Sequence, residues 1–286
     1  MSEVLEPTRK NTPLTAGAQV RAMYMSDMAS VVAIITDFDD DDGEAAEAEF
    51  EELGIEGQFV IVDDEHVLGI TGFREVENCD ATYYLNWTYL DGSYYGQGLG
   101  KKLLGNVLDR LREMGGRKIF VKVSDYKDEG GHNVYAAALA MYKSFGFVEE
   151  VISVDFYEEG ENQTILGLEL ISQADDVIVN DETPVIRFNG LFEIAETDGA
   201  YTFEWSVEKS AGFFGKRSFS ADDLYVGINA IKDQGGRKIF LTFPSNLVLI
   251  HKPLQSVGFK YVGQLKDYYE EGLHELHFSH DLSSFD

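Results

Sequence analysis

Three short segments of this 286-residue chain occur twice, in the same order along the sequence. GGRKIF at 115–120 returns unchanged at 235–240, SFGF at 144–147 returns as SVGF at 256–259, and DFYEEG at 155–160 returns as DYYEEG at 267–272. The offset is 120 residues for the first pair and 112 for the other two, so the second repeat is shorter by eight residues. Ordered self-similarity of this kind predicts two domains of one ancestral fold.

We place the first domain at 1–171, a linker at 172–183 and the second domain at 184–286. The linker SQADDVIVNDET interrupts the apolar pattern on both sides of it. Residues 1–171 are called the first repeat below, and residues 184–286 the second repeat.

The first repeat alternates between apolar runs typical of strands and runs with helical spacing. We expect strands over 19–25, 81–90 and 117–124, a hairpin over 57–73, and two final strands on either side of 157–163. We expect helices over 28–35 with Asp27 as the N-terminal cap, after the glycines at 96–100, and over 133–144. These elements predict an α/β fold of the mixed, α+β type, in which each of two tandem domains has a mixed β-sheet flanked by helices.

The charge of the chain is strongly negative, with 51 acidic residues against 23 Lys and Arg, a formal net charge of -28. Such a surface repels nucleic acid and anionic lipid, so we expect neither as a partner. The acidity has two explanations that stay open here, a saline cell or a cationic substrate. One cysteine, Cys79, and the lack of an apolar run long enough to span a bilayer favour a cytoplasmic protein.

The segment YYGQGLGKKLL at 94–104 places three alternate glycines directly before an amphipathic helix. The expected apolar face of that helix comprises Leu103, Leu104, Val107, Leu108, Leu111 and Met114, and Gly115 and Gly116 end it. The glycines let successive N–H groups turn inward, and the positive end of the helix dipole points at the same place, so the loop predicts a phosphate site. Lys101 stands where a dinucleotide fingerprint needs glycine, and the spacing of a Walker loop is missing as well.

This strand, glycine loop and helix resemble those of the GNAT N-acetyltransferases, whose loop Q/R-x-x-G-x-G/A holds the pyrophosphate of acetyl-CoA. The likeness covers residues 20–170 and includes YKSFGF at 142–147, which resembles the family's Y-x-x-x-G-F ending of its fourth helix. It implies acetyl-CoA as cofactor, bound by Leu90, Tyr95, Gly96, Gln97, Gly98, Leu99, Gly100, Lys101 and Asn133. Two positions differ from the family: Tyr95 replaces the usual Arg or Gln, and Tyr135 replaces an Asn that helps to hold the pantetheine.

The resemblance also implies the chemistry, in which a neutral amine attacks the thioester carbonyl directly. The N–H of Leu90 would stabilise the oxyanion, and Tyr142 would protonate the departing thiolate. Asp91 is a candidate general base, with a turn-forming role as the alternative. In this family the acceptor is usually selected by the connection after the first helix and by the loop between the last two strands.

In this chain those two regions are acidic, which favours a cationic amine. Residues 37–52 contain ten acids, and the later loop contains Glu158, Glu159 and Glu161. Ordinary solvated surface is the alternative. We therefore expect a small-molecule N-acetyltransferase, with a protein lysine or N-terminal acetyltransferase and a noncatalytic acyl-CoA-binding module as the other candidates.

The second repeat lacks the residues that carry this chemistry. Ser218 and Ser220 stand at the positions of Gly98 and Gly100, and Leu254 stands at the position of Tyr142. We expect it to bind no CoA and to wall the acceptor pocket, stabilise the first repeat or contact a second copy in a homodimer. Its histidines His274, His277 and His280 alternate along a predicted strand, so we expect no metal site.

Overall fold

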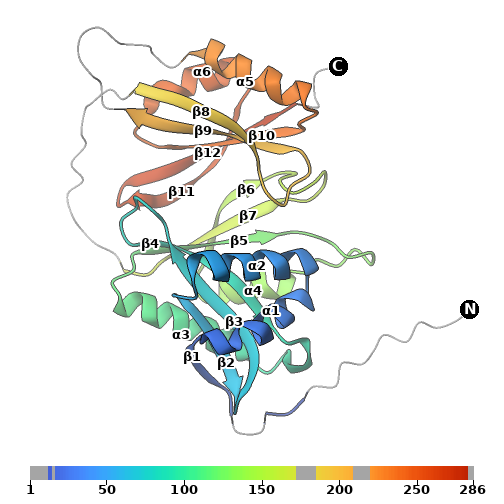
Figure 1. The fold of residues 1–286 in the computed structure, drawn as a ribbon. Coiled ribbons are helices and arrows are strands. Elements are labelled where there is room, and N and C mark those ends of the chain that lie inside the picture. Colours follow the sequence, from blue (N-terminus) through green and yellow to red (C-terminus); the bar gives the residue numbers. More distant parts are fainter. Residues whose placement is uncertain (1–11, 15–16, 172–184, 209–219, 283–286) are drawn as a thin grey trace, which may run out of the picture. The chain divides into compact units, whose positions relative to one another are not determined.

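The computed structural model describes residues 12–14, 17–171, 185–208 and 220–282 (Figure 1). The predicted linker at 172–183 lies outside these residues. Contacts divide the chain into two compact units, which are described separately. The first unit holds Met1–Glu77 and Tyr83–Ile119, and the second holds Asn78–Thr82 and Phe120–Asp286. The second unit therefore combines residues 78–82 and the end of the first repeat with all of the second repeat.

The first unit is an antiparallel sheet with helices on both faces. In chain order its elements are β1 (Gln19–Ala22), the short 3-10 helix η1 (Met25–Asp27), α1 (Met28–Thr36), α2 (Asp40–Leu53), β2 (Gln58–Asp63), β3 (His66–Glu75), β4 (Thr82–Leu90), the 3-10 helix η2 (Gly92–Tyr94) and α3 (Leu99–Glu113). Its strands lie in the order β1-β2-β3-β4, and each neighbouring pair is antiparallel. The apolar sides of α1 and α2 pack on Val60, Val62 and Ile70 of the sheet.

Helix α3 confirms the predicted amphipathic face, because Leu99, Leu103, Leu104, Val107, Leu108 and Leu111 are all buried. Met114 was expected on this face but is 61% exposed, since the helix has ended at Glu113. Gly115 then takes a left-handed conformation with φ of 82°, and the Gly116 N–H donates to the Leu111 carbonyl at 2.7 Å. The two glycines end the helix as predicted.

The region before β2 differs from the sequence prediction in two ways. Asp27 precedes α1 but makes no side-chain cap, because its carboxylate binds the Arg21 guanidinium at 2.6 and 2.9 Å and the Tyr24 N–H at 2.8 Å. The acidic stretch that was expected to be a connection forms α2. Asp39 starts that helix by accepting hydrogen bonds from the N–H groups of Asp41 and Asp42.

The second unit contains two groups of strands. Its elements are β5 (Lys118–Ser124, all but its first two residues), α4 (Ala136–Ser144), β6 (Val148–Ser153), β7 (Gln163–Glu169), β8 (Val185–Glu193), β9 (Ala200–Glu208), α5 (Ala221–Asp233), β10 (Lys238–Pro244), the 3-10 helix η3 (Val248–Ile250), α6 (His251–Ser256), β11 (Lys260–Glu270) and β12 (Leu273–Asp281). The strand order β5-β7-β6 recurs as β10-β12-β11, and β9 and then β8 continue the sheet on the other side of β10. The pairing of β9 with β10 is parallel, so the five-stranded sheet is mixed.

Helices α5 and α6 cover one face of the five-stranded sheet (Figure 1). Their core contains Leu224, Ile228, Phe243, Leu254 and Phe278, all buried. Leu254, the counterpart of Tyr142, is therefore a core residue. In the part of the chain that the structure describes, no helix is both long and apolar enough to cross a membrane.

Candidate functional site

The glycine loop, residues 95–101, connects β4 and η2 to the first turn of α3. Gly96 and Gly98 both have φ of 77°, in the left-handed region that favours glycine. A Cβ atom added to either residue would meet no protein atom within 4 Å. Helix α3 begins at Leu99, so Gly100 lies in the first turn, where N–H groups point out along the helix axis. The residues present thus leave room for an anion in front of the helix.

Neighbouring residues hold the loop in place. The Gln97 side-chain amide donates to the Thr12 carbonyl at 2.9 Å, and the Thr12 N–H donates to the Ser93 carbonyl at 3.0 Å. The Asp91 carboxylate accepts from the Ser93 N–H at 2.8 Å and starts η2. These contacts favour the turn-forming role for Asp91 over that of a base, and they give Gln97 a structural role. Tyr95 is 38% exposed beside the glycines.

Leu90 ends β4 directly before this loop. It lies opposite Gly69 in the ladder with β3, and the Asp91 N–H donates to the Leu68 carbonyl at 2.9 Å. In an antiparallel ladder this pattern makes Leu90 and Gly69 a non-hydrogen-bonded pair. The Leu90 N–H is therefore directed away from β3, as the proposed oxyanion role requires.

A β-bulge that the sequence did not predict precedes Leu90 in β4. The register of β4 against β3 shifts by one residue between Asn86 and Tyr89, and Trp87 has φ of 45°, rare for a bulky residue. The Glu49 carboxylate of α2 accepts from the Trp87 indole N–H at 2.9 Å and the Asn86 amide at 3.1 Å. Sequence reasoning missed this contact, because Glu49 is one of ten acids in 37–52 and no neighbouring residue distinguishes it.

Asp42 anchors the other end of α2 to the same strand. The Tyr89 hydroxyl donates a hydrogen bond to its carboxylate. Burial raises the pKa of Asp42 above the usual aspartate value, the nearby charges of Asp39 and Asp41 raise it further, and the hydrogen bond from Tyr89 opposes them. Two of the ten acids in 37–52, Asp42 and Glu49, thus accept hydrogen bonds from side chains of β4. The acids of this stretch therefore do not all face solvent.

The raised pKa of Asp42 predicts a pH-dependent gain from Asp42→Asn. Because the folded state disfavours the ionised carboxylate, the amide should raise the melting temperature at pH 7, where Asp42 is charged. The gain should vanish below about pH 3.9, where the carboxyl is protonated in both states. Thermal unfolding between pH 3 and pH 8 measures this, and a gain that is constant across the range would contradict it.

Asp27→Asn is the matched control with the opposite sign. The hydrogen bond from Arg21 lowers the pKa of Asp27, so its carboxylate contributes stability above about pH 3.9, and that contribution is lost as pH falls through the lowered pKa. This variant should therefore melt below the unmodified protein at pH 7.

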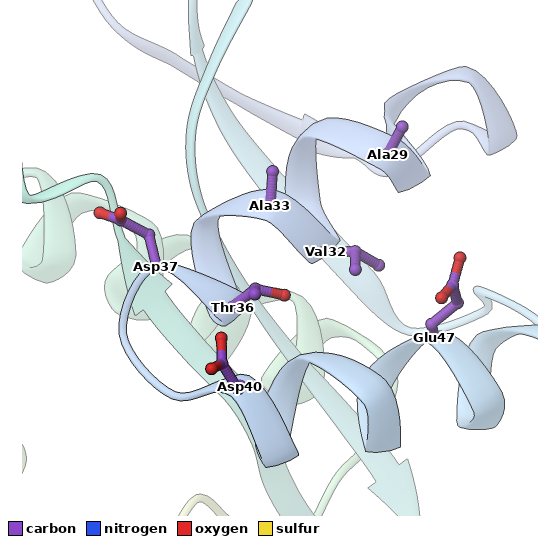
Figure 2. Close-up of a pocket in the computed structure, with 7 residues that line it drawn as sticks. All are labelled: Ala29, Val32, Ala33, Thr36, Asp37, Asp40 and Glu47. Atoms are coloured by element: carbon purple, nitrogen blue, oxygen red, sulfur yellow. The ribbon is translucent and has the colours of Figure 1, made fainter.

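A shallow groove of about 550 Å³ lies over α1 and α2 (Figure 2). Its apolar residues are Ala29, Val32 and Ala33, and its carboxylates are Asp37, Asp40 and Glu47. These three carboxylates belong to the acidic connection that the sequence associated with acceptor choice.

The second unit holds the other predicted site residues. Tyr142 is 4% exposed in α4, and its ring centroid lies 5.6 Å from that of Phe147. The Asn133 side-chain oxygen accepts from the Tyr135 N–H at 2.8 Å, so its amide shapes the start of α4. Helix α4 begins at Ala136, three residues later than predicted.

The hairpin between β6 and β7 carries the acids that were predicted to select the acceptor. Glu158 and Glu159 are exposed. Glu161 is half-buried and accepts a hydrogen bond from the Ser124 hydroxyl. Only the first two are therefore displayed fully to solvent.

The histidines of β12 have separate partners. The Asp267 N–H donates to His274 Nδ1, the His277 ring lies 2.9 Å from Glu275, and the His280 ring lies 3.2 Å from the Gly258 carbonyl. Burial lowers the pKa of His280. Among the described residues, no three His, Cys, Asp or Glu side chains are placed to hold a metal ion.

These elements define an α/β protein whose helix α3 starts from a left-handed glycine turn. Residues 28–147 match the model of the family described as the Acetyltransferase (GNAT) family. The acetyl donor of that family is acetyl-CoA. No curated protein matches the chain.

Several solved structures are similar to slightly more than half of the chain. One from Desulfovibrio desulfuricans, described as a GNAT-family acetyltransferase, has 22% identity over 54% of this chain and 100% of that chain, with a TM-score of 0.49. The ribosomal-protein-S18-alanine N-acetyltransferase from Escherichia coli has 20% identity over 57% and 100%, with a TM-score of 0.45. A structure from Salmonella typhimurium, described as an acetyltransferase with its cofactor acetyl-CoA, has 18% identity over 55% and 96%, with a TM-score of 0.45.

Proposed function

We propose that this protein transfers the acetyl group of acetyl-CoA to the primary amine of a small cationic or amino-acid-like molecule. The observation that carries the proposal is the left-handed glycine loop at the N-terminus of α3, within the residues that match the GNAT family. Gly96 and Gly98 leave the space in front of the helix free of side chains, and the first-turn N–H groups point into it. The pyrophosphate of the cofactor fits such a cradle.

Each residue then has a stated task. Bound acetyl-CoA supplies a thioester carbonyl and a thiol leaving group. The N–H groups of Gly98, Leu99, Gly100 and Lys101 would hold its pyrophosphate, and the resemblance implies that Tyr95 and Asn133 would also contact the cofactor. The Leu90 N–H would donate to the carbonyl oxygen as the C–N bond forms and negative charge develops there. As the C–S bond breaks, the Tyr142 hydroxyl would give its proton to the sulfur, and the proton lost by the amine nitrogen would return through solvent to the Tyr142 phenolate.

The experiment that tests this function is release of free CoA from acetyl-CoA against a panel of amines. The panel contains polyamines, aminoglycosides, amino acids and a lysine peptide. Release with a small amine supports the proposal, whereas release with the peptide alone favours the protein acetyltransferase. Binding of acetyl-CoA without release on any amine would favour an acyl-CoA-binding module.

Exposed acids near the acceptor should make the reaction sensitive to salt. Glu158 and Glu159 would concentrate a cationic amine by a field that is screened over about 8 Å at physiological ionic strength. The KM for the amine should rise with salt, whereas the KM for acetyl-CoA, an anion, should fall or stay level. Replacing Glu158 and Glu159 with Gln should weaken the dependence of the amine KM on salt concentration. Adding Glu161→Gln should abolish it.

The second repeat offers a matched control for this charge change. Glu270 and Glu271 occupy the positions of Glu158 and Glu159 in the later hairpin. Replacing them with Gln removes the same charge and should leave the salt dependence unchanged. If both pairs of substitutions act equally, the acids of the first hairpin serve only general solvation.

A further inference from the structure

The repeated sequences GGRKIF and D-F/Y-Y-E-E-G are not used by the glycine loop or by Tyr142. The first begins β5 and β10. The second follows β6 in the first repeat, and in the second repeat it forms the end of β11 together with the turn to β12. We call residues 155–160 the first EEG turn and residues 267–272 the second EEG turn. Both turns belong to the second unit, so their surroundings can be compared directly.

The two EEG turns are built in the same way. Asp155 and Asp267 have φ of 50° and 54°, both left-handed. The Asp155 carboxylate accepts from the Gly160 N–H at 3.0 Å, and the Asp267 carboxylate accepts from the Gly272 N–H at 2.9 Å. Near-identical sequence therefore gives equivalent local structure.

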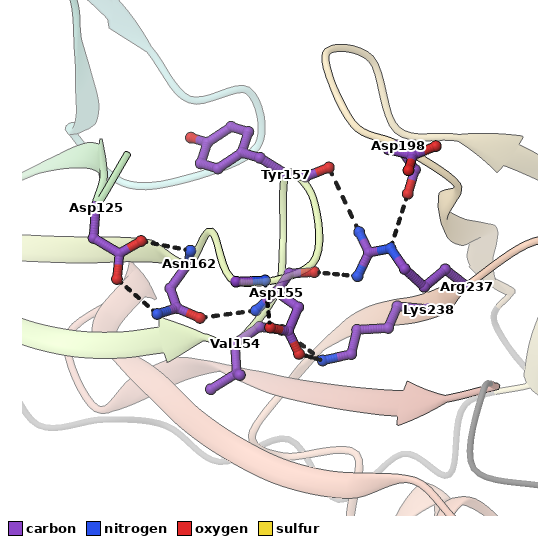
Figure 3. A network of polar contacts seen from close by, with 9 residues as sticks. Asp125, Val154, Asp155, Tyr157, Asn162, Asp198, Arg237 and Lys238 are labelled. Atoms are coloured by element: carbon purple, nitrogen blue, oxygen red, sulfur yellow. Dashed lines mark hydrogen bonds and ion pairs between the residues drawn. The ribbon is translucent and has the colours of Figure 1, made fainter. Parts of the chain in front are cut away.

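Two residues at the start of β10, in the second repeat, donate hydrogen bonds to the first EEG turn and to the residue before it (Figure 3). Lys238 Nζ donates to the Asp155 carboxylate at 2.7 Å and to the Val154 carbonyl at 2.8 Å. Arg237 donates to the Asp155 carbonyl at 2.7 Å. The Lys238 side chain is only 10% exposed, and its hydrogen bond lowers the pKa of Asp155. A buried cation with these partners is expensive to leave unpaired.

The first repeat makes the reciprocal contacts. The ring of Phe240 lies 5.0 Å from that of Phe156, and the ring of Phe120, the counterpart of Phe240, lies 5.5 Å from that of Tyr268, the counterpart of Phe156. Thus each GGRKIF strand places its phenylalanine on the EEG turn of the other repeat.

Backbone contacts show the same reciprocity. The Asp198 N–H of the second repeat donates to the Tyr157 carbonyl at 2.7 Å, and the Asp80 N–H of the first repeat donates to the Tyr269 carbonyl at 2.6 Å. Tyr157 and Tyr269 are counterparts in the two EEG turns. The hydroxyl of Thr82, beside Asp80, also donates to the Tyr268 carbonyl at 2.8 Å.

Between the two turns, counterpart strands β6 and β11 contact each other. The Glu150 carboxylate accepts from the Lys266 N–H at 2.5 Å. A Cβ added to Gly263 would lie 3.2 Å from a methyl group of Val151, and Gly263 is the counterpart of Val151. Reciprocal contacts, with counterpart residues meeting at the centre, are the mark of an isologous interface with two-fold symmetry.

We propose that the second repeat is a partner subunit joined to the chain, bound to the first repeat through a pseudo-two-fold interface made of the EEG turns and the starts of β5 and β10. Its partner is a second copy of the same fold. This interface accounts for the near-identity of two of the three repeated motifs, which fold stability alone does not demand. Of the three roles that the sequence left open for the second repeat, this interface favours stabilisation of the first repeat over walling the acceptor pocket or contacting a second copy.

Hydrogen exchange of the full-length chain tests the proposal through its crossed pattern. Lys238→Met, in the second repeat, should speed amide exchange in the first EEG turn about tenfold or more and leave the second turn unchanged, because a hydrogen bond between charged groups is lost. Thr82→Val, in the first repeat, should speed exchange in the second EEG turn and leave the first unchanged. Lys252→Met removes the same charge from an exposed site of α6 and should change neither turn.

Effects confined to the repeat that carries each substitution would overturn the proposal, as would equal effects on both turns. If Lys238→Met does not fold, Arg237→Gln removes the hydrogen bond to the Asp155 carbonyl and keeps the lysine, so the same crossed pattern can be read from it. Lys238 and Arg237 do not belong to the proposed cofactor site. The exchange result therefore stands whether or not the protein transfers acetyl groups.

Discussion

Gly98→Val should abolish the stabilisation that acetyl-CoA gives to the protein. At about a hundred times its dissociation constant, the ligand should stabilise the unmodified folded state by roughly 2.7 kcal/mol, a rise of several degrees in melting temperature. A valine side chain would occupy the space in front of α3 that the pyrophosphate needs. It meets no protein atom at its Cβ, so binding should be lost while the chain still folds.

Gly115→Val is the matched control at the other end of the same helix. Gly115 has φ of 82° against 77° for Gly98, and a Cβ there also has open space. The two substitutions impose the same kind of backbone strain, of order 1–3 kcal/mol. Only Gly98→Val should remove the response to acetyl-CoA. An equal loss in both variants, or no response in the unmodified protein, would reject the cofactor site; nicotinamide dinucleotides should give no shift.

Tyr142→Phe should lower turnover about a hundredfold or more while acetyl-CoA still binds, because positioned acid catalysis contributes an effect of that size. The ring and its packing on Phe147 are kept, so a fall in kcat without loss of the thermal shift isolates the proton donor. Tyr225→Phe removes a hydroxyl at an exposed position of α5 and should change nothing. Full turnover in Tyr142→Phe would remove Tyr142 from the mechanism.

The elements that the sequence predicted best are those whose apolar residues follow one period. Helix α3 has six leucine and valine residues at helical spacing, and its glycine ends are visible in the sequence. Helix α2 escaped prediction because its buried residues are only Gly43, Ala46 and Phe50 among acids. The prediction that Asp27 caps α1 was wrong, because its carboxylate binds the guanidinium of Arg21 in the preceding strand.

The candidate site follows the same division. The glycine loop was predictable because its chemistry lies in consecutive residues. Two hydrogen bonds join α2 to the bulged part of β4, one between Glu49 and Trp87 and one between Asp42 and Tyr89. Their partners are about forty residues apart in sequence, so no local pattern predicted them. The repeated motifs were visible, but their use required knowing that each reaches the other repeat.

The placement of Gly263 opposite Val151 has a consequence for how chains avoid one another. A self-pairing subunit must set identical residues on both sides of its axis, whereas a fused pair may set valine against glycine. Two first repeats from different chains would bring valine against valine at a place where even a Cβ added to Gly263 would lie 2.9 Å from the Glu150 carbonyl oxygen. Such a pairing is sterically penalised, so first repeats of different chains should not pair with each other through this surface.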